Sequence, residues 1–255
     1  MSLSFLQELT KKRYRIFTAK EAHAIGKNLK LKTSYIPRLL YLLTQKKVLR
    51  SLMIGRYALA DDFLSGSPIS PYEIAMHLAH QGAIGYWSAM IEHGLSDQNL
   101  TTTFILKPYE NSTTFPRTHN FTIENHLYRV IPTKEEDFWG IEQRFFNEIP
   151  FQVTNLERTL LDGLRLPQYC GGFQEVLFGF EQAVSRLQKD VLLDYAKLCS
   201  IVTQKRLGWI LEKLSRFPEL QEQLHPKNSN TYDRLDPQGE RRGSQNLRWK
   251  LIENI

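Results

Sequence analysis

Residues 15–59 read RIFTAKEAHAIGKNLKLKTSYIPRLLYLLTQKKVLRSLMIGRYAL, and this stretch predicts the fold of the N-terminal part of the chain. Residues 18–21 form a capping box, in which the Thr18 hydroxyl and the Glu21 carboxylate satisfy each other's backbone amides, so we expect a helix to begin there. A turn at residues 26–28 separates it from a second helix, which begins near Thr33. The apolar residues of the second helix follow helical spacing and predict one buried stripe, made of Ile36, Leu39, Leu40 and Leu43.

Two β-rich segments follow the second helix. Residues 48–52 and 56–59 flank a short turn with Gly55, a pattern typical of a β-hairpin. Helix, turn, helix and hairpin in this order predict a winged helix-turn-helix domain over residues 1–61. Residues 61–70 contain glycine, proline and several serines, and therefore predict a linker.

The remainder of the chain, residues 70–255, predicts a larger mixed α+β domain. Strand-like segments between about 100 and 153 predict a mixed sheet, and the chain from about 155 onward is predicted to be helical. Residues 226–246 are polar and rich in turn formers, so we expect a loose loop there, followed by an anchoring segment at Trp249 and Leu251. The predicted fold class is thus α+β, with a helical C-terminal half.

The charge of the chain is unevenly distributed. The 255 residues carry a net charge of +6, but residues 1–60 hold 13 basic and 2 acidic side chains, which gives +11. The remaining 20 basic and 25 acidic residues give −5. A basic head on a mildly acidic body is expected when one end of a protein faces a polyanion, with double-stranded DNA as the leading candidate. The alternative is a solvated basic surface without a nucleic-acid partner.

The second predicted helix is the candidate DNA-reading element, because the N-terminal end of this helix enters the major groove in a helix-turn-helix. The residues expected there are Thr33, Ser34, Tyr35 and Arg38. Arg38 is the best candidate for a base edge, since its guanidinium can bind guanine O6 and N7 together. The residues expected on phosphates are Lys27, Lys30, Lys32, Lys46 and Lys47. Arg50 and Arg56 flank the hairpin tip and are expected to touch the DNA backbone or minor groove. The alternative is a protein-docking module whose lysines keep it in solution.

Signatures of enzymes and of membrane proteins are largely absent. The sequence contains no GxxxxGK[ST] phosphate loop, no GxSxG elbow and no GxGxxG, so we expect no enzymatic activity and no cofactor. His77 and His80 share a helical face with Glu73 but lack a recognised zinc pattern, so we expect no metal site. Two cysteines, the lack of a secretory signal and the lack of a long apolar stretch predict a cytoplasmic protein with no membrane partner. Catalysis by residues scattered along the sequence stays open as an alternative.

Four segments, in this order, resemble the AbiEi family of antitoxins. They are residues 55–59 (GRYAL), residues 85–95 (GYWSAMIEHGL), residues 153–164 (VTNLERTLLDGL) and residues 205–212 (KRLGWILE). Residues beyond about 215 show no such match. The family belongs to type IV toxin–antitoxin systems, which act in abortive phage infection.

The resemblance implies a two-domain bacterial protein. Its N-terminal domain would bind an inverted repeat in the promoter of its own operon and repress transcription. Its C-terminal domain would counteract a nucleotidyltransferase toxin encoded next to it, without needing a stable complex with that toxin. The resemblance transfers no catalytic residue.

Two other function classes stay open beside the antitoxin. One is a ligand-responsive winged-helix transcription factor, and the other is a nucleic-acid-processing enzyme with the basic domain as a DNA-targeting arm. Within the 153–164 segment, Arg158 and Asp162 have the i, i+4 spacing of an ion pair on a helix surface. Lys205 and Arg206 form a local basic patch, which is a further candidate contact with flanking DNA.

Overall fold

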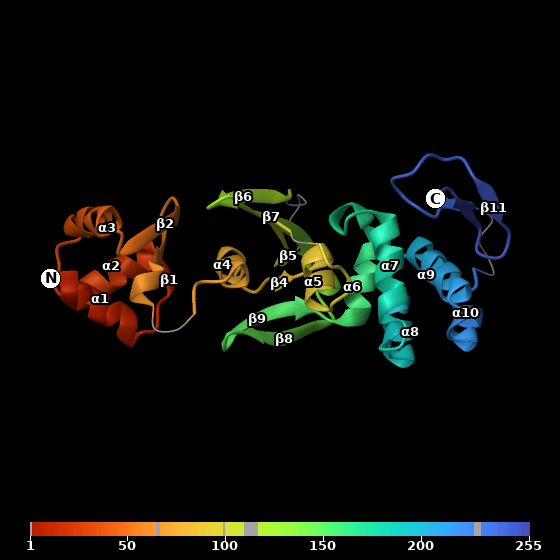
Figure 1. Cartoon of the computed structure of the whole chain (residues 1–255), viewed down its shortest axis with the longest axis horizontal. Coiled ribbons are helices and arrows are strands. Elements are labelled where there is room, and N and C mark those ends of the chain that lie inside the picture. The colour runs from red at the N-terminus through yellow and green to blue at the C-terminus, as the bar shows by residue number, and fades with distance from the viewer. Residues whose placement is uncertain (1, 65–66, 99, 110–116, 227–230) are drawn as a thin grey trace.

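The computed structural model describes residues 2–64, 67–98, 100–109, 117–226 and 231–255. The molecule is elongated, and three parts follow one another along its long axis in chain order (Figure 1). We call them the N-terminal region (residues 2–64), the middle region (residues 67–154) and the C-terminal region (residues 155–255).

The N-terminal region consists of three helices and a three-stranded antiparallel sheet with strand order β1-β3-β2. Its elements are α1 (Ser2–Lys11), β1 (Ile16–Thr18), α2 (Ala19–Asn28), α3 (Tyr35–Gln45), β2 (Leu49–Met53) and β3 (Arg56–Leu59). Both halves of the predicted capping box are present at the start of α2. The predicted stripe of α3 is confirmed, because all four of its apolar residues are buried in the core of this region. Gly26 lets α2 and α3 approach closely, since a Cβ there would lie 2.3 Å from Ile36 Cδ1.

The middle region is built on a six-stranded mixed sheet with strand order β6-β7-β5-β4-β9-β8. Its elements are α4 (Pro71–Leu78), β4 (Ala83–Ile84), α5 (Tyr86–Glu92), β5 (Thr102–Tyr109), β6 (His119–Ile123), β7 (His126–Lys134), β8 (Ile141–Phe146) and β9 (Ile149–Thr154). Strands β5 and β7 are parallel, as are β4 and β9, while the other neighbouring pairs are antiparallel. The sheet therefore begins at Ala83, earlier in the chain than the sequence indicated, because β4 is too short to show an alternating pattern.

The two faces of this sheet are covered by different helices. Along β5, Ile105 packs in one core with residues of α4, whereas Phe104 and Leu106 pack in another with residues of α5 and α6. This alternation is the period of two expected of a strand. Figure 1 shows α4 between the sheet and the N-terminal region, with α5 and α6 on the opposite side.

The C-terminal region is helical up to residue 224. Its helices are α6 (Leu156–Arg165), α7 (Phe173–Ala183), α8 (Lys189–Leu198), α9 (Ile201–Lys213) and α10 (Pro218–Leu224), and a short 3-10 helix, η3 (Pro167–Tyr169), follows α6. A small sheet follows, in the order β10 (Asp233–Arg234), β12 (Leu251–Glu253) and β11 (Ser244–Asn246). The sequence predicted a loose loop over much of this segment. The difference arises because Trp249 is fully buried against Gly208 of α9, and this tertiary contact fixes the segment.

The N-terminal region packs directly on the middle region. The outer side of the small sheet contributes Ile16, Leu52 and Ala58 to the same apolar cluster as Ile74 and Ala75 of α4. Arg15 reaches across, and its Nε lies 2.9 Å from Glu73 Oε1 while its Nη2 donates to the carbonyl of Ser67 at 2.7 Å. The whole chain is thus a mixed α+β fold, in which the basic head is docked on the second part.

Among the described residues, every helix is too short or too polar to cross a membrane.

Candidate nucleic-acid interface

The turn between α2 and α3 brings several of the predicted DNA-contacting residues together. Lys27, Lys30, Lys32 and Thr33 line one surface depression of about 650 Å³, together with His23. The side chains of these lysines are exposed. They carry no ion pair or hydrogen bond with any residue that the structure describes, so their charges are directed only at solvent.

The outer face of α3 continues this basic surface. Ser34 and Arg38 are exposed, and Arg38 has no ion-pair partner among the described residues. Tyr35 is half-buried and packs against the core of the N-terminal region, so only part of its ring is free to contact a ligand. Lys46 and Lys47 are exposed as well, but they follow the C-terminal end of α3. Eleven helical residues place them about 16 Å from the lysines of the turn, a span comparable to several phosphates of one DNA strand.

Arg50 and Arg56, which the sequence predicts as contacts with the DNA backbone or minor groove, lie apart from the surface around the α2–α3 turn. Arg50 Nη1 lies 3.1 Å from Glu124 Oε2, and its Nη2 lies 3.5 Å from Asp61 Oδ1. Arg56 Nη1 donates a hydrogen bond to the carbonyl of His77 at 2.8 Å. Both arginines are held at the contact with the middle region because the sheet that carries them docks there. The exposed cations without ion-pair partners among the described residues thus lie on α2, the turn and α3, and the two hairpin arginines are engaged elsewhere.

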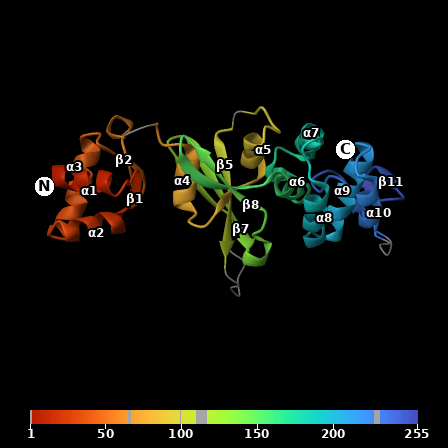
Figure 2. The same ribbon diagram turned by 90° about the horizontal axis from the view of Figure 1, so that it is seen from below.

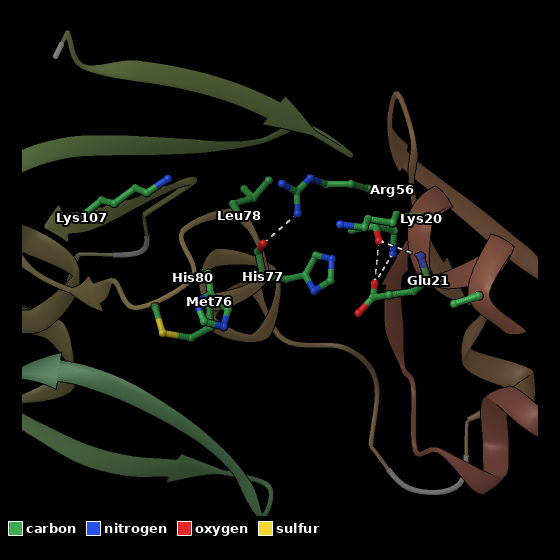
Figure 3. Close-up of a pocket in the computed structure, with 10 residues that line it drawn as sticks. Lys20, Glu21, Arg56, Met76, His77, Leu78, His80 and Lys107 are labelled. Atoms are coloured by element: carbon green, nitrogen blue, oxygen red, sulfur yellow. Dashed lines mark hydrogen bonds between the residues drawn. The ribbon is translucent and has the colours of Figure 1, made fainter. Parts of the chain in front are cut away.

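A second, groove-like cavity of about 600 Å³ lies between α2 and α4 (Figure 3). The exposed side chains of Lys20, His80 and Lys107 line it, so the groove is basic. Figure 3 shows the His77 ring pointing from α4 toward Lys20 and Glu21 of the N-terminal region. Burial, followed by the charge of Arg56, lowers the pKa of His77, so this imidazole is neutral at physiological pH. Glu21, the one acid among the described residues that line the groove, is engaged in the capping box through its carboxylate.

Sequence reasoning did not single out Lys20 or Lys107, and it considered His80 only as a metal ligand. Lys20 belongs to the excess of basic residues before position 61, and this excess was the available signal for it. Lys107 lies at the exposed end of β5, and only the docking of the two regions brings it near α2. Lys205 and Arg206 had been candidates for flanking DNA, but both are buried: Lys205 Nζ lies 2.7 Å from Asp233 Oδ2, and Arg206 Nη1 donates to the carbonyl of Leu164 at 2.9 Å.

Comparisons with known proteins bear on the fold. No family model matches the chain, and no curated protein matches it. Among solved structures, the RV2827C protein from Mycobacterium tuberculosis is similar in structure, with a TM-score of 0.68 and 13% sequence identity. The match covers 98% of this chain and 90% of that one. This likeness extends over all three regions and shows that their arrangement recurs in a protein of very different sequence.

Proposed function

We propose that residues 2–60 are a winged helix-turn-helix that binds double-stranded DNA, with α3 in the major groove. The observation that carries this proposal is the set of exposed, unpaired cations at the N-terminal end of α3 and in the turn before it. Helix α3 buries one apolar face against the domain and exposes Arg38 beside the lysines of the turn, and a recognition helix needs such a buried face and an exposed N-terminal end. The order of elements and the antiparallel β2–β3 hairpin support the same assignment.

Each part of the basic surface has a distinct role in the proposal. Arg38 reads a base edge, with Thr33 and Ser34 beside it at the start of the helix. The lysines of the turn and those after α3 hold phosphates and set the position of the helix without specifying sequence. Lys20 and Lys107 extend the cationic surface into the groove, where a flanking phosphate is the expected contact.

We further propose that the protein is an antitoxin and an autorepressor of a type IV toxin–antitoxin operon. The four sequence segments that resemble the AbiEi family support this reading. Two copies would occupy the two halves of an inverted repeat. One domain on a short half-site binds weakly, but binding of the first copy raises the effective concentration of the second and so increases the overall affinity. The middle and C-terminal regions would counteract the nucleotidyltransferase toxin without a stable complex.

The DNA proposal is tested by fluorescence anisotropy with a labelled duplex from the region upstream of the gene. We expect specific binding. The logarithm of the association constant should fall with the logarithm of salt concentration at a slope of about −4 to −5, as for about five phosphate contacts. Arg38→Ala should weaken binding by about tenfold and relax sequence preference. The matched control is Lys12→Ala, which removes an exposed cation that follows α1, a helix distinct from α2 and α3 (Figures 1 and 2). Equal losses in both variants, or no binding at low salt, would contradict the proposal.

The antitoxin proposal is tested by growth. Expression of the neighbouring toxin alone should arrest growth, and the full-length protein from an independent promoter should restore it. The Arg38→Ala variant should restore growth equally well, because neutralisation is assigned to the larger part of the chain. Loss of rescue in that variant would tie neutralisation to DNA binding, and failure of the wild type would remove the antitoxin assignment.

A ligand-responsive transcription factor remains a second candidate, and one observation favours it. A cavity of about 380 Å³ between the middle and C-terminal regions has a buried tyrosine hydroxyl and an arginine among its lining residues. Pockets of this size with a few polar groups on an apolar wall are typical of small-molecule sites.

A further inference from the structure

The cavity of about 380 Å³ lies where α5, α6, η3 and β7 meet. Tyr86 at the start of α5, Arg165 at the end of α6 and Tyr169 in η3 line it, together with Ile131 of β7. Arg117 lines it as well and is exposed. We call it the Tyr86 cavity. It is distant in sequence from the basic surface around α3 and shares no lining residue with it.

Two polar groups of the Tyr86 cavity lack partners in the structure. The Tyr86 side chain is fully buried, and its hydroxyl has no hydrogen-bond partner among the described residues. The Arg165 guanidinium is half-buried and forms no ion pair or hydrogen bond with any described residue. Buried polar groups in native proteins are almost always satisfied, so the unpartnered Tyr86 hydroxyl indicates a missing acceptor, and the half-buried Arg165 cation beside it favours an acceptor with negative charge.

The carboxylate nearest to these groups is already engaged. Asp162 lies close enough to influence Tyr86 and Arg165, but its Oδ2 lies 2.7 Å from Arg158 Nε in a buried ion pair. Burial raises the pKa of the Tyr86 hydroxyl far above its ordinary value, so the group stays protonated and available as a donor. No carboxylate lines the described part of the cavity, and its polar side therefore favours an anion.

The opposite side of the cavity is aromatic and apolar. The rings of Tyr86 and Tyr169 lie edge to face, with centroids 5.2 Å apart. A further guanidinium, that of Arg129, lies 6.0 Å from the Tyr169 ring centroid. Leu166 and Ile131 complete the wall. An aromatic wall beside cations accommodates a flat ring that carries an anionic group, because rings stack on tyrosine and phosphates pair with arginine.

The backbone at Tyr86 is strained. Its φ of 52° lies in the left-handed region, which a bulky aromatic residue rarely adopts. The preceding Gly85 has no room for a side chain, since a Cβ there would lie 1.8 Å from Leu106 Cδ1. Strained residues that the surrounding structure enforces are concentrated at functional sites, and Tyr86 is one of the residues that line the cavity.

We propose that the Tyr86 cavity is a binding site for a mononucleotide. The phosphate binds between the Arg165 and Arg117 guanidinium groups and accepts a hydrogen bond from the Tyr86 hydroxyl. The base lies against the Tyr169 ring. Stacking on an aromatic side chain tolerates every base, so the phosphate and the ring, rather than base identity, define the ligand class. The site is separate from the DNA-binding surface, and the proposal does not depend on DNA binding.

The test is isothermal titration calorimetry of the full-length protein with three probes: AMP, inorganic phosphate and adenosine. AMP should bind more tightly than either fragment, because it alone offers both the phosphate and the ring. Arg165→Gln should weaken AMP binding by about tenfold or more, the loss expected for one charge-assisted hydrogen bond. Tyr86→Phe, which keeps the ring and removes only the hydroxyl, should weaken it about threefold to tenfold.

Two controls make the result specific. Arg242→Gln removes an exposed arginine elsewhere, whose side chain is 89% exposed, and should leave AMP affinity unchanged. The double variant Lys27→Gln/Lys32→Gln should lose DNA binding and keep AMP binding. The proposal is overturned if AMP does not bind at millimolar concentration, if Arg165→Gln binds AMP as tightly as the wild type, or if the lysine variant abolishes AMP binding. The first two outcomes leave the DNA-binding function unaffected.

Discussion

At the scale of single residues, the ion pair between Arg158 and Asp162 shows how a correct spacing can be misread. The i, i+4 spacing predicted a pair on the surface of a helix, and the pair exists, but its side chains are only 1% and 4% exposed. The Arg158 guanidinium also lies 3.8 Å from the Trp139 ring centroid and donates to the carbonyl of Asp137 at 2.7 Å. The sequence could not reveal this, because α6 is covered on every side by elements distant in the chain.

Because the pair is buried, breaking it should be costly. Arg158→Leu leaves the Asp162 carboxylate buried without its partner and should lower the free energy of unfolding by about 3–5 kcal/mol. The measurement is urea denaturation followed by circular dichroism. The control is Lys197→Ala, which breaks an exposed pair with Asp194 and should cost less than about 0.5 kcal/mol. Similar losses in the two variants would mean that the Arg158 pair is solvated.

The buried, neutral imidazole of His93 should make the stability of the protein depend on pH. Its Nε2 donates to the carbonyl of Thr154 at 2.7 Å, and Arg144 donates to its Nδ1 at 3.1 Å, so the ring is neutral. Burial is the main cause that lowers the pKa of His93 below its ordinary value of 6.5. The unfolded chain therefore takes up a proton at higher pH than the folded chain, and the contribution of His93 to stability is lost as the pH falls below 6.5.

The check compares the wild type with His93→Gln between pH 8 and pH 5. The wild type should lose more unfolding free energy over this interval than the variant does. The difference between the two curves isolates His93 from His77 and His126, whose pKa values are lowered as well. Parallel curves would show that His93 does not titrate differently in the folded and unfolded chains.

At the scale of elements, the capping patterns in the sequence formed completely at one helix start and only in part at another. The capping box of α2 formed as predicted, with the Thr18 hydroxyl accepting from the Glu21 amide at 3.2 Å. Ser70 and Glu73 have the same spacing before α4, but the box there forms only in part, since the Ser70 hydroxyl accepts from the Glu73 amide while the Glu73 carboxylate accepts from Arg15. Before α6, Asn155 is the N-cap and accepts from the Arg158 amide. At α4, a tertiary partner that the sequence does not show decided the outcome.

The capping box of α2 supports the turn that presents the lysines. Thr18→Ala should therefore lower the unfolding free energy by about 1 kcal/mol, the usual loss for removal of an N-cap side chain. The control is Thr10→Ala, whose hydroxyl only bonds back to the carbonyl of Leu6 within α1 and should matter little. Chemical denaturation measures both. A loss no larger than that of Thr10→Ala would show that the capping box contributes nothing to stability.

At the scale of the whole molecule, the sequence predicted the components better than their assembly. The α+β class and the burial of the α3 stripe follow from hydrophobic period and capping, which act over a few residues. Two other features depend on contacts between distant segments. One is the set of contacts that Arg50 and Arg56 make with the middle region, and the other is the Tyr86 cavity. The residues of the turn and α3 lie together because they are continuous in sequence, whereas only the docking of the two regions decides the partners of the hairpin arginines.

The contact between the N-terminal and middle regions should be energetically coupled through Arg15 and Glu73, whose side chains are 17% and 13% exposed. Arg15→Met leaves a largely buried carboxylate unpaired and should lower the unfolding free energy by about 2 kcal/mol. Adding Glu73→Gln should recover part of this loss, which a double-mutant cycle measures. Lys134→Met, which breaks a pair with Glu136 that is 48% and 63% exposed, is the control. Purely additive effects of the two substitutions would contradict the coupling.

The apolar seam formed by Ile16, Leu52 and Ala58 has a consequence for how two copies would share one operator. The seam fixes the orientation of the N-terminal region relative to the rest of the chain. If two copies contact each other through their larger regions, their N-terminal regions can therefore bind only half-sites that face the same side of the duplex. One turn of DNA takes about 10.5 base pairs. Inserting about five base pairs between the half-sites should abolish cooperative binding, and inserting about ten should restore it.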